Sequence, residues 1–166
     1  MRLHKNLSAI IVTPENPMPT EQFAAEELAA YLKKCIGIVA PIASIPETGK
    51  YTFILGCPDR NASASSIISS EDFVNNIPGP EGIYIKISDA ATVIAGSEDG
   101  DGHNRGLIYA VYEYLEQYLH CCFGAFTKPG TIGGEIVPVY NELFLENTVY
   151  TKAKADLTCR DRKSVV

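Results

Sequence analysis

Two segments of this chain, 20–36 and 107–119, carry apolar residues at helical spacing, and each has a single apolar stripe. A helix of this kind must bury its stripe on one surface while its other sides face water. Two such helices need a common partner surface, which a β-sheet supplies. The predicted stripes consist of Ala24, Leu28, Tyr31, Leu32 and Cys35 in the first helix and of Leu107, Val111, Leu115 and Tyr118 in the second.

The first helix has signals at both ends. Thr20 can cap its N-terminus, and Glu21 lies in the first turn, where an acidic side chain is favourable. Lys33 and Lys34 lie in the last turn, and Gly37 can take the left-handed backbone that often ends a helix. These residues predict a helix that stops at the glycine.

Short β-branched runs predict the sheet. The run 8–12 (SAIIV) is a first strand, and 51–56 (YTFILG) is apolar nearly throughout, which is typical of a central strand buried on both faces. The run 38–44 contains Pro41, which cannot donate a backbone hydrogen bond. We therefore expect 38–44 at a sheet edge.

Two further runs, 82–88 and 91–96, predict an antiparallel hairpin in which Tyr84 faces water. One or two short helices are expected between Asn61 and Ile77, and one more strand near Ile136. The resulting fold class is α/β (α+β): a two-layer sandwich in which two main amphipathic helices pack on one face of a mixed sheet.

Composition excludes several classes of partner. The 166 residues include 46% hydrophobic ones, and the net charge is −6 with scattered acids. Nucleic acids and anionic membranes are held by clustered Lys and Arg, so we expect neither as a partner. No apolar run is long enough to cross a bilayer. The sequence does not indicate in which cellular compartment the protein lies. The five cysteines form no C-x-x-C pair and are expected to be buried thiols: Cys35, Cys57, Cys121, Cys122 and Cys159.

The glycine-rich stretch from Gly96 to Gly106 raises the possibility of a phosphate site. It contains no lysine, and its glycine spacing does not fit a dinucleotide fingerprint. Asp99 and Asp101 would repel a phosphate and suggest calcium instead, but the rest of the loop lacks the glycine and glutamate of a calcium loop. We therefore expect a simple connection, with no cofactor and no metal.

No catalytic constellation is evident. The three histidines are scattered, and no nucleophile or metalloprotease motif is present. The second helix carries Tyr109, Tyr112 and Glu116 opposite its core stripe. These three residues are candidates for an interface, either packing against another domain, which we favour, or stacking on a sugar.

The order of the elements resembles a known family. The segments IIVTPENPMPTEQFAAEELAAYLKKCIGIVAPI, ILG, GIYIKI, VIAG and NRGLIYAVYEYLEQYL are together similar to the N-terminal, non-catalytic domain of bacterial α-glucuronidases and related glycoside-hydrolase-like proteins. The resemblance covers roughly residues 8 to 150. It implies a fold like the second domain of β-hexosaminidases, placed before a (β/α)8 barrel that holds the acid and base carboxylates. A barrel needs about 250 residues.

One departure from the family follows the second helix. Many relatives read Leu-Gly-Cys-Arg-Trp there, whereas this chain reads Leu-His-Cys-Cys-Phe from Leu119 to Phe123. His120 replaces the usual helix-ending glycine, and the arginine and tryptophan of the relatives are missing. Any ligand contact made by those two residues is therefore not expected here.

The resemblance predicts a domain organisation and a function. Residues 1–150 form the accessory domain, 151–160 begin a linker to a missing catalytic barrel, and 161–166 (DRKSVV) resemble a translated sequencing adapter. We expect a fragment of a glycoside hydrolase that acts on glucuronic-acid-substituted plant polysaccharide such as xylan. The alternative is a self-contained carbohydrate- or protein-binding module that uses the Tyr109 and Tyr112 face.

Overall fold

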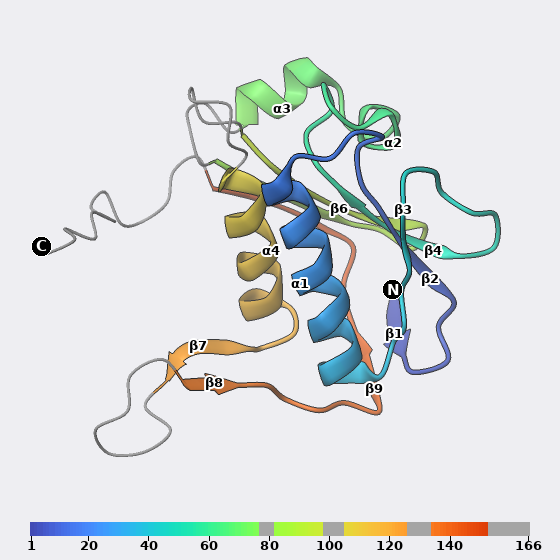
Figure 1. The fold of residues 1–166 in the computed structure, drawn as a ribbon, viewed down its shortest axis with the longest axis vertical. Coiled ribbons are helices and arrows are strands. Elements are labelled where there is room, and N and C mark those ends of the chain that lie inside the picture. The colour runs from blue at the N-terminus through green and yellow to red at the C-terminus, as the bar shows by residue number, and fades with distance from the viewer. Residues whose placement is uncertain (77–81, 98–104, 126–133, 153–166) are drawn as a thin grey trace, which may run out of the picture.

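The computed structural model describes residues 1–76, 82–97, 105–125 and 134–152. Its elements surround one mixed sheet (Figure 1). Their bounds are β1 (Arg2–His4), β2 (Ala9–Val12), α1 (Pro19–Ile36), β3 (Ile42–Ala43), β4 (Tyr51–Leu55), α2 (Ala62–Ser65), α3 (Ser70–Asn76), β5 (Ile83–Ile87), β6 (Ala91–Gly96), α4 (Arg105–Gln117), β7 (Cys122–Ala125), β8 (Gly134–Ile136), β9 (Glu142–Phe144) and β10 (Thr148–Lys152).

The main sheet has six strands in the order β10-β5-β6-β4-β2-β3. Strands β3, β2, β4 and β6 run parallel, whereas β5 is antiparallel to both β6 and β10. Strand β4 lies between β2 and β6 and is buried at all its positions, as its apolar sequence predicts. The residues after Pro41 form the edge strand β3, and the predicted hairpin is the β5–β6 pair.

Helices α1 and α4 lie side by side on one face of this sheet (Figure 1). This arrangement confirms the predicted two-layer sandwich. Every predicted stripe residue of α1 is buried, and so are Leu107, Val111 and Leu115 of α4. They join the inward side chains of the strands in one main core. Tyr118 is only half-buried, and Tyr114, which the predicted stripe left out, is fully buried instead.

The N-terminus of α1 differs from the sequence-based expectation. The helix begins at Pro19, a residue suited to this position because its missing N–H has no helical partner there. Thr20 therefore lies inside the helix, and the prediction that it caps the helix is wrong. The backbone N–H of Met18 donates instead to the Glu21 carboxylate at 2.8 Å. At the other end, Gly37 takes the predicted left-handed backbone, with φ of 79°.

A second, smaller core cluster on the other face of the sheet includes residues of the segment that contains α2 and α3. One or two short helices were predicted in this region, and the structure has two, α2 and α3. Ile68 and Phe73 are buried here, and the Tyr84 ring lies 6.1 Å from that of Phe73. Tyr84 was expected to face water, but its exposed fraction is only 6%. The alternating pattern of β5 did not reveal this cover, because the cover comes from a different segment.

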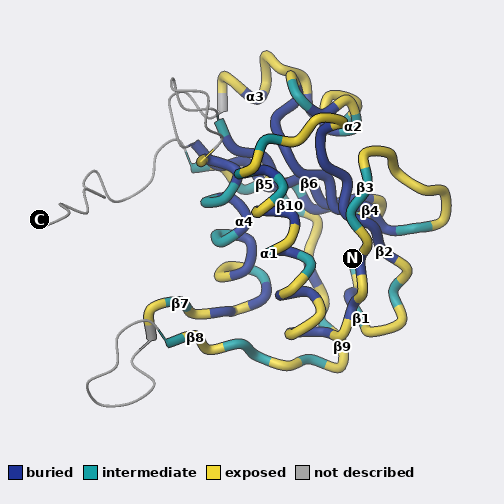
Figure 2. Tube along the Cα trace, viewed as in Figure 1, coloured by how far each residue is buried: buried dark blue, intermediate teal, exposed yellow. Residues whose placement is uncertain are grey.

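Two small antiparallel sheets complete the described structure. Strand β1 pairs with β9, and β7 pairs with β8. Of these four strands only β8 was expected from the sequence, as the strand near Ile136. Strand β10 was not expected either, and it extends the main sheet to Lys152. These strands lie at the margin of the molecule and are largely exposed or half-buried (Figure 2).

The hydroxyl group of Tyr114 lies in the main core and has no hydrogen-bond partner within the described part of the chain. Its ring packs on those of Phe53 and Tyr118, with centroids 6.3 and 5.4 Å away. Burial raises the pKa of Tyr114 well above its ordinary value, so the group stays neutral. A buried hydroxyl without a partner costs stability.

We therefore expect Tyr114→Phe to raise the free energy of unfolding by about 1 kcal/mol, because it removes the unpaired hydroxyl and keeps the ring. Tyr51→Phe is the matched control, since the Tyr51 hydroxyl bonds Thr92 at 2.7 Å and the Ser88 carbonyl at 3.0 Å. That variant should lose about 1 kcal/mol. Urea denaturation measures both, and a loss of stability in Tyr114→Phe would show that its hydroxyl is paired.

The two long helices end in the same way. After α1, Gly37 is left-handed and the Ile38 N–H bonds the Leu32 carbonyl. After α4, His120 has φ of 54° and the Cys121 N–H bonds the Leu115 carbonyl at 3.0 Å. His120 is the one described residue other than glycine with a positive φ. It thus adopts the left-handed backbone that glycine adopts most readily.

We expect His120→Gly to raise the free energy of unfolding by roughly 1 kcal/mol, because left-handed backbone is strained for residues with a β-carbon. Gly37→Ala is the reverse substitution at the end of α1 and serves as the control. It should lower the free energy of unfolding by about 1–2 kcal/mol. Thermal unfolding of both variants checks this pair. An unchanged midpoint for His120→Gly would mean that the imidazole makes a compensating contact.

Candidate interaction surfaces

The three interface candidates on α4 have different surroundings. The Tyr112 hydroxyl donates to Glu27 of α1 at 2.7 Å, and its ring meets the Phe123 ring edge-on, with centroids 4.9 Å apart. Burial and the adjacent Glu27 raise the pKa of Tyr112 to about 12, so the hydroxyl remains a donor. Tyr109 is half-buried against the main core, and Glu116 is exposed. The expected open tyrosine patch is therefore partly closed by internal contacts of Tyr112.

The β7–β8 pair forms an arm that is attached to α1 through Tyr31. The Tyr31 hydroxyl donates to Glu135, and its ring meets Phe123 edge-on at 5.4 Å. Lys34 forms an ion pair with Glu135 at 3.1 Å and lies over the Tyr31 ring. The hydrogen bonds from Tyr31 and Lys34 lower the pKa of Glu135. No signal in the sequence joined Glu135 to α1, because the two are about a hundred residues apart.

Helix α4 contacts β10 through the carboxylate of Glu113. Glu113 accepts a hydrogen bond from the Tyr150 hydroxyl at 2.5 Å and lies 3.6 Å from the Lys152 ammonium group. Partial burial and the charge of Glu113 raise the pKa of Glu116. Since Glu113 already has two partners on β10, the arrangement serves to fasten the edge strand to the helix.

The glycines at the ends of the 96–106 stretch have a structural explanation. A β-carbon on Gly96 would lie 2.0 Å from the Gly106 carbonyl carbon, and one on Gly106 would lie 2.5 Å from the Ser97 oxygen. The start of α4 therefore packs directly on the end of β6. The residues 98–104, where phosphate and calcium were considered, lie outside the described residues.

The carboxyl ends of parallel strands are where open α/β sheets commonly bind ligands. Here the ends of β2 and β4 are occupied by internal polar contacts. Asn61 is buried, and its amide donates to the carbonyls of Val12 and Leu55. Glu21 is also buried and binds the Arg60 guanidinium through two bonds of 2.7 and 2.8 Å. These side chains hold the turns together at the position that a ligand would take.

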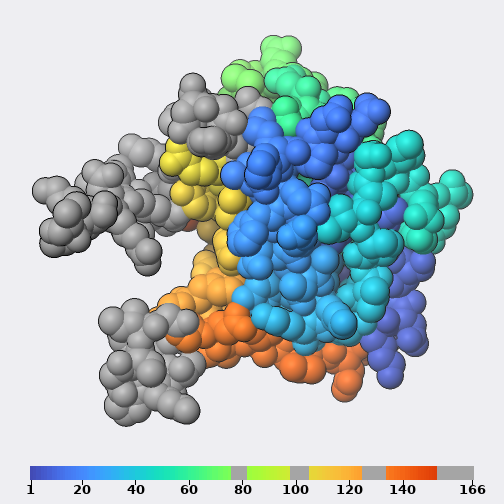
Figure 3. All heavy atoms as spheres, viewed as in Figure 1, coloured from blue at the N-terminus to red at the C-terminus, as the bar shows by residue number. Residues whose placement is uncertain are grey.

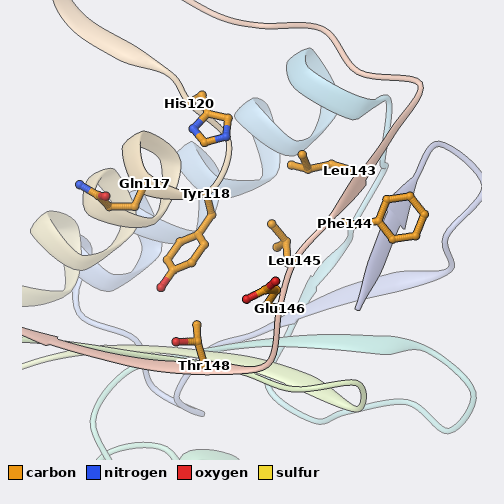
Figure 4. Close-up of a pocket in the computed structure, with 8 residues that line it drawn as sticks. All are labelled: Gln117, Tyr118, His120, Leu143, Phe144, Leu145, Glu146 and Thr148. Atoms are coloured by element: carbon orange, nitrogen blue, oxygen red, sulfur yellow. The ribbon is translucent and has the colours of Figure 1, made fainter.

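An open groove lies at the C-terminal end of α4 (Figure 4). Its volume is about 310 Å³. Tyr118 and Glu146 point toward the same space, with Thr148 below them in the view. The groove is lined by both apolar and polar side chains. Its lining consists of Gln117, Tyr118, His120, Leu143, Phe144, Leu145, Glu146 and Thr148.

Neither metal nor membrane chemistry is indicated within the described ranges. In those ranges, no three His, Cys, Asp or Glu residues come close enough to hold a metal ion together. No helix of the same ranges is long and apolar enough to span a bilayer.

Comparison with known proteins identifies a sequence family and a solved structure that are similar to this chain. The sequence family described as the N-terminus of glycosyl hydrolase family 67 matches residues 2–114, from β1 into α4. None of the curated proteins matches the chain. Among solved structures, a family GH115 4-O-methyl-α-glucuronidase with specificity for decorated arabinogalactans is similar, with a TM-score of 0.60 and 14% identity. At this identity the likeness concerns the fold.

The alignment with that glucuronidase covers 91% of this chain and 18% of the larger one. The family match spans more than half of the present sequence, including the first helix and the glycine at each end of the 96–106 stretch. The predicted resemblance to the N-terminal domain of α-glucuronidases is therefore confirmed. The chain belongs to the N-terminal domain family of the family 67 glycosyl hydrolases.

Proposed function

We propose that this domain is the non-catalytic accessory part of an α-glucuronidase-like glycoside hydrolase that acts on glucuronic-acid-substituted plant polysaccharide such as xylan. Its partner would be a (β/α)8 catalytic barrel of the same polypeptide, which would hold the two carboxylates of the reaction. The observation that carries the proposal is the family match over residues 2–114. The substrate rests on the activity of related enzymes.

The chemistry of the described residues supports a non-catalytic role. A glycosidase needs two carboxyl groups on opposite sides of the scissile bond, one as acid and one as base or nucleophile. The best-placed acid of α4, Glu113, is bound by Tyr150 and Lys152. Glu21 is fully buried against Arg60. These carboxylates stabilise the fold and are not presented to a substrate.

The proposal predicts that the purified chain releases no glucuronic acid from aldobiouronic acids above the buffer rate. The reason is that positioned acid–base catalysis requires carboxyl groups within reach of the bond. Chromatography of the released sugar measures the rate, and Glu116→Gln is the control for the exposed carboxylate of α4. Turnover in the clean protein that vanishes in Glu116→Gln would contradict the accessory role.

The truncation is part of the same proposal, and the nucleotide sequence beyond codon 160 tests it. An open frame that encodes a barrel would support an accessory domain of a longer enzyme. A genuine stop codon without adapter sequence would instead favour the self-contained module.

The groove beside Tyr118 favours that second candidate, a carbohydrate-binding module. Affinity electrophoresis with soluble glucuronoxylan and arabinogalactan would detect such binding. Tyr118→Ala should weaken binding in the groove, while Tyr109→Ala should weaken it on the α4 face. Retained binding in both variants would exclude both surfaces, and no binding by the original chain would exclude the module.

A further inference from the structure

Two cysteines that are far apart in the sequence meet in the main core. The Cys35 sulfur lies 3.6 Å from the Cys121 sulfur, although 86 positions separate the residues. Cys35 belongs to the last turn of α1, and Cys121 follows α4 immediately before β7. Both side chains are buried, with exposed fractions of 0% and 4%. The sulfur atoms thus already face each other at van der Waals distance.

The remaining described cysteines cannot take either place. Cys57 is buried in the smaller cluster on the opposite face of the sheet. Cys122 is exposed on β7 and adjoins Cys121 in the chain, where a bond between neighbours would be strained. The structure therefore singles out one pairing among the cysteines that it describes.

The surroundings of the pair are also suited to a cross-link. The chain between β8 and β9 lies along the end of α1 (Figure 3), where the Tyr140 N–H donates to the Cys35 carbonyl at 2.7 Å. The Cys121 N–H in turn bonds the Leu115 carbonyl. Both cysteine backbones are therefore held by hydrogen bonds, and closing the sulfur–sulfur distance to about 2.05 Å requires an approach of roughly 1.5 Å by the side chains.

We propose that Cys35 and Cys121 form a disulfide bond when the protein meets a small-molecule disulfide, and that this bond fastens the end of α1 to the start of the β7–β8 arm. The Cys121 thiolate attacks the small disulfide, forms a mixed disulfide and expels one thiolate. The Cys35 thiolate then attacks the Cys121 sulfur and expels the second. Two thiol protons leave the protein, which loses two electrons, and the oxidant is reduced to two thiols.

The bond would stabilise the fold because it joins the last turn of α1 to the start of the β7–β8 arm across 86 positions. Cross-linking distant residues restricts the unfolded chain more strongly than cross-linking close ones. The arm beyond Cys121 carries Phe123 and Glu135, which hold Tyr31 and Tyr112. A bond at Cys121 would therefore also restrict the motion of the arm relative to Tyr31 of α1 and Tyr112 of α4.

Reaction at neutral pH is expected to be slow. Burial raises the pKa of Cys35 and raises that of Cys121 to about 12, and the thiolate is the reactive form. The negative charge of Glu135 on β8 also raises the pKa of both thiols, whereas the positive charge of Lys34 on α1 lowers it. Exchange therefore requires mildly alkaline buffer and hours of incubation.

The test uses the full chain in oxidised and reduced glutathione at pH 8.5. Free thiols are then blocked by alkylation, and the intact mass and the disulfide-linked peptides are determined. We expect two of the five thiols to escape alkylation, one peptide linking Cys35 to Cys121, and a melting temperature higher by roughly 5–15 °C. Five alkylated thiols, or a peptide that joins other cysteines, would overturn the proposal.

Variants separate this pairing from the alternatives. Cys57→Ser and Cys122→Ser should retain the bond and the rise in melting temperature, whereas Cys35→Ser should lose both. If Cys35→Ser fails to fold, the peptide map of the original chain still decides the pairing. A rise in melting temperature that persists in Cys35→Ser would mean that glutathione acts elsewhere, and would contradict the proposal.

Discussion

Replacing Gly96 by alanine should lower the free energy of unfolding by about 3–5 kcal/mol. The added β-carbon would lie 2.0 Å from the Gly106 carbonyl carbon and 2.2 Å from the Leu107 nitrogen. Both are backbone atoms, so the clash cannot be relieved by turning a side chain. Relief requires α4 to move away from β6, and the packing of its buried stripe on the sheet would be lost. Urea denaturation followed by circular dichroism measures the loss.

Gly49→Ala is the matched control for this steric effect. Gly49 has φ of 82°, and a β-carbon on it would meet nothing within 4 Å. Its replacement should therefore cost only the strain of left-handed backbone, about 1–2 kcal/mol. An equal or smaller loss for Gly96→Ala would show that the start of α4 can shift at little cost, and that the close contact is not needed.

Replacing Arg60 by methionine should lower the free energy of unfolding by about 3 kcal/mol. The Glu21 side chain has an exposed fraction of 0%, and the Arg60 guanidinium binds both of its carboxylate oxygens. Methionine keeps much of the volume but removes this charge. The buried carboxylate would then lose the opposite charge of Arg60, and burial of an ionised carboxylate is costly without such a charge.

Two further variants separate burial from charge. Arg2 pairs with Glu142 on the surface, with exposed fractions of 59% and 43%, so Arg2→Met should change stability by less than about 0.5 kcal/mol. The double variant Glu21→Met/Arg60→Met should recover part of the loss, because it removes both buried charges. If Arg60→Met lowered the free energy of unfolding as little as Arg2→Met does, the buried pair would not be important for stability.

Much of the fold followed from local sequence. The stripe of α1, its end at Gly37, the apolar strand β4 and the edge position after Pro41 were all predicted correctly. Each depends on residues within a few positions of one another, through helical periodicity, a left-handed turn or a missing N–H.

The candidate site was less predictable. Tyr112 was assigned to the helix side opposite the core stripe, but it is half-buried against the main core, and its partners Glu27 and Phe123 come from α1 and β7. The sequence did not indicate the groove at the end of α4, because five of its eight lining residues come from β9 and the chain after it. No periodicity links such segments, and their polar, short strands resemble loops in the sequence.

The sequence by itself determined the helices, the central strands and the side of each helix that is buried, because these properties depend on near neighbours. Tertiary structure alone decided that Glu21 is buried, that Tyr84 is covered and that Cys35 faces Cys121. Glu21 has the acidic side chain expected in a solvated first turn, and the Arg60 guanidinium, 39 positions away, helps to make its burial tolerable. The physical reason is that burial of polar and sulfur-containing groups depends on partners which chain folding brings from distant segments.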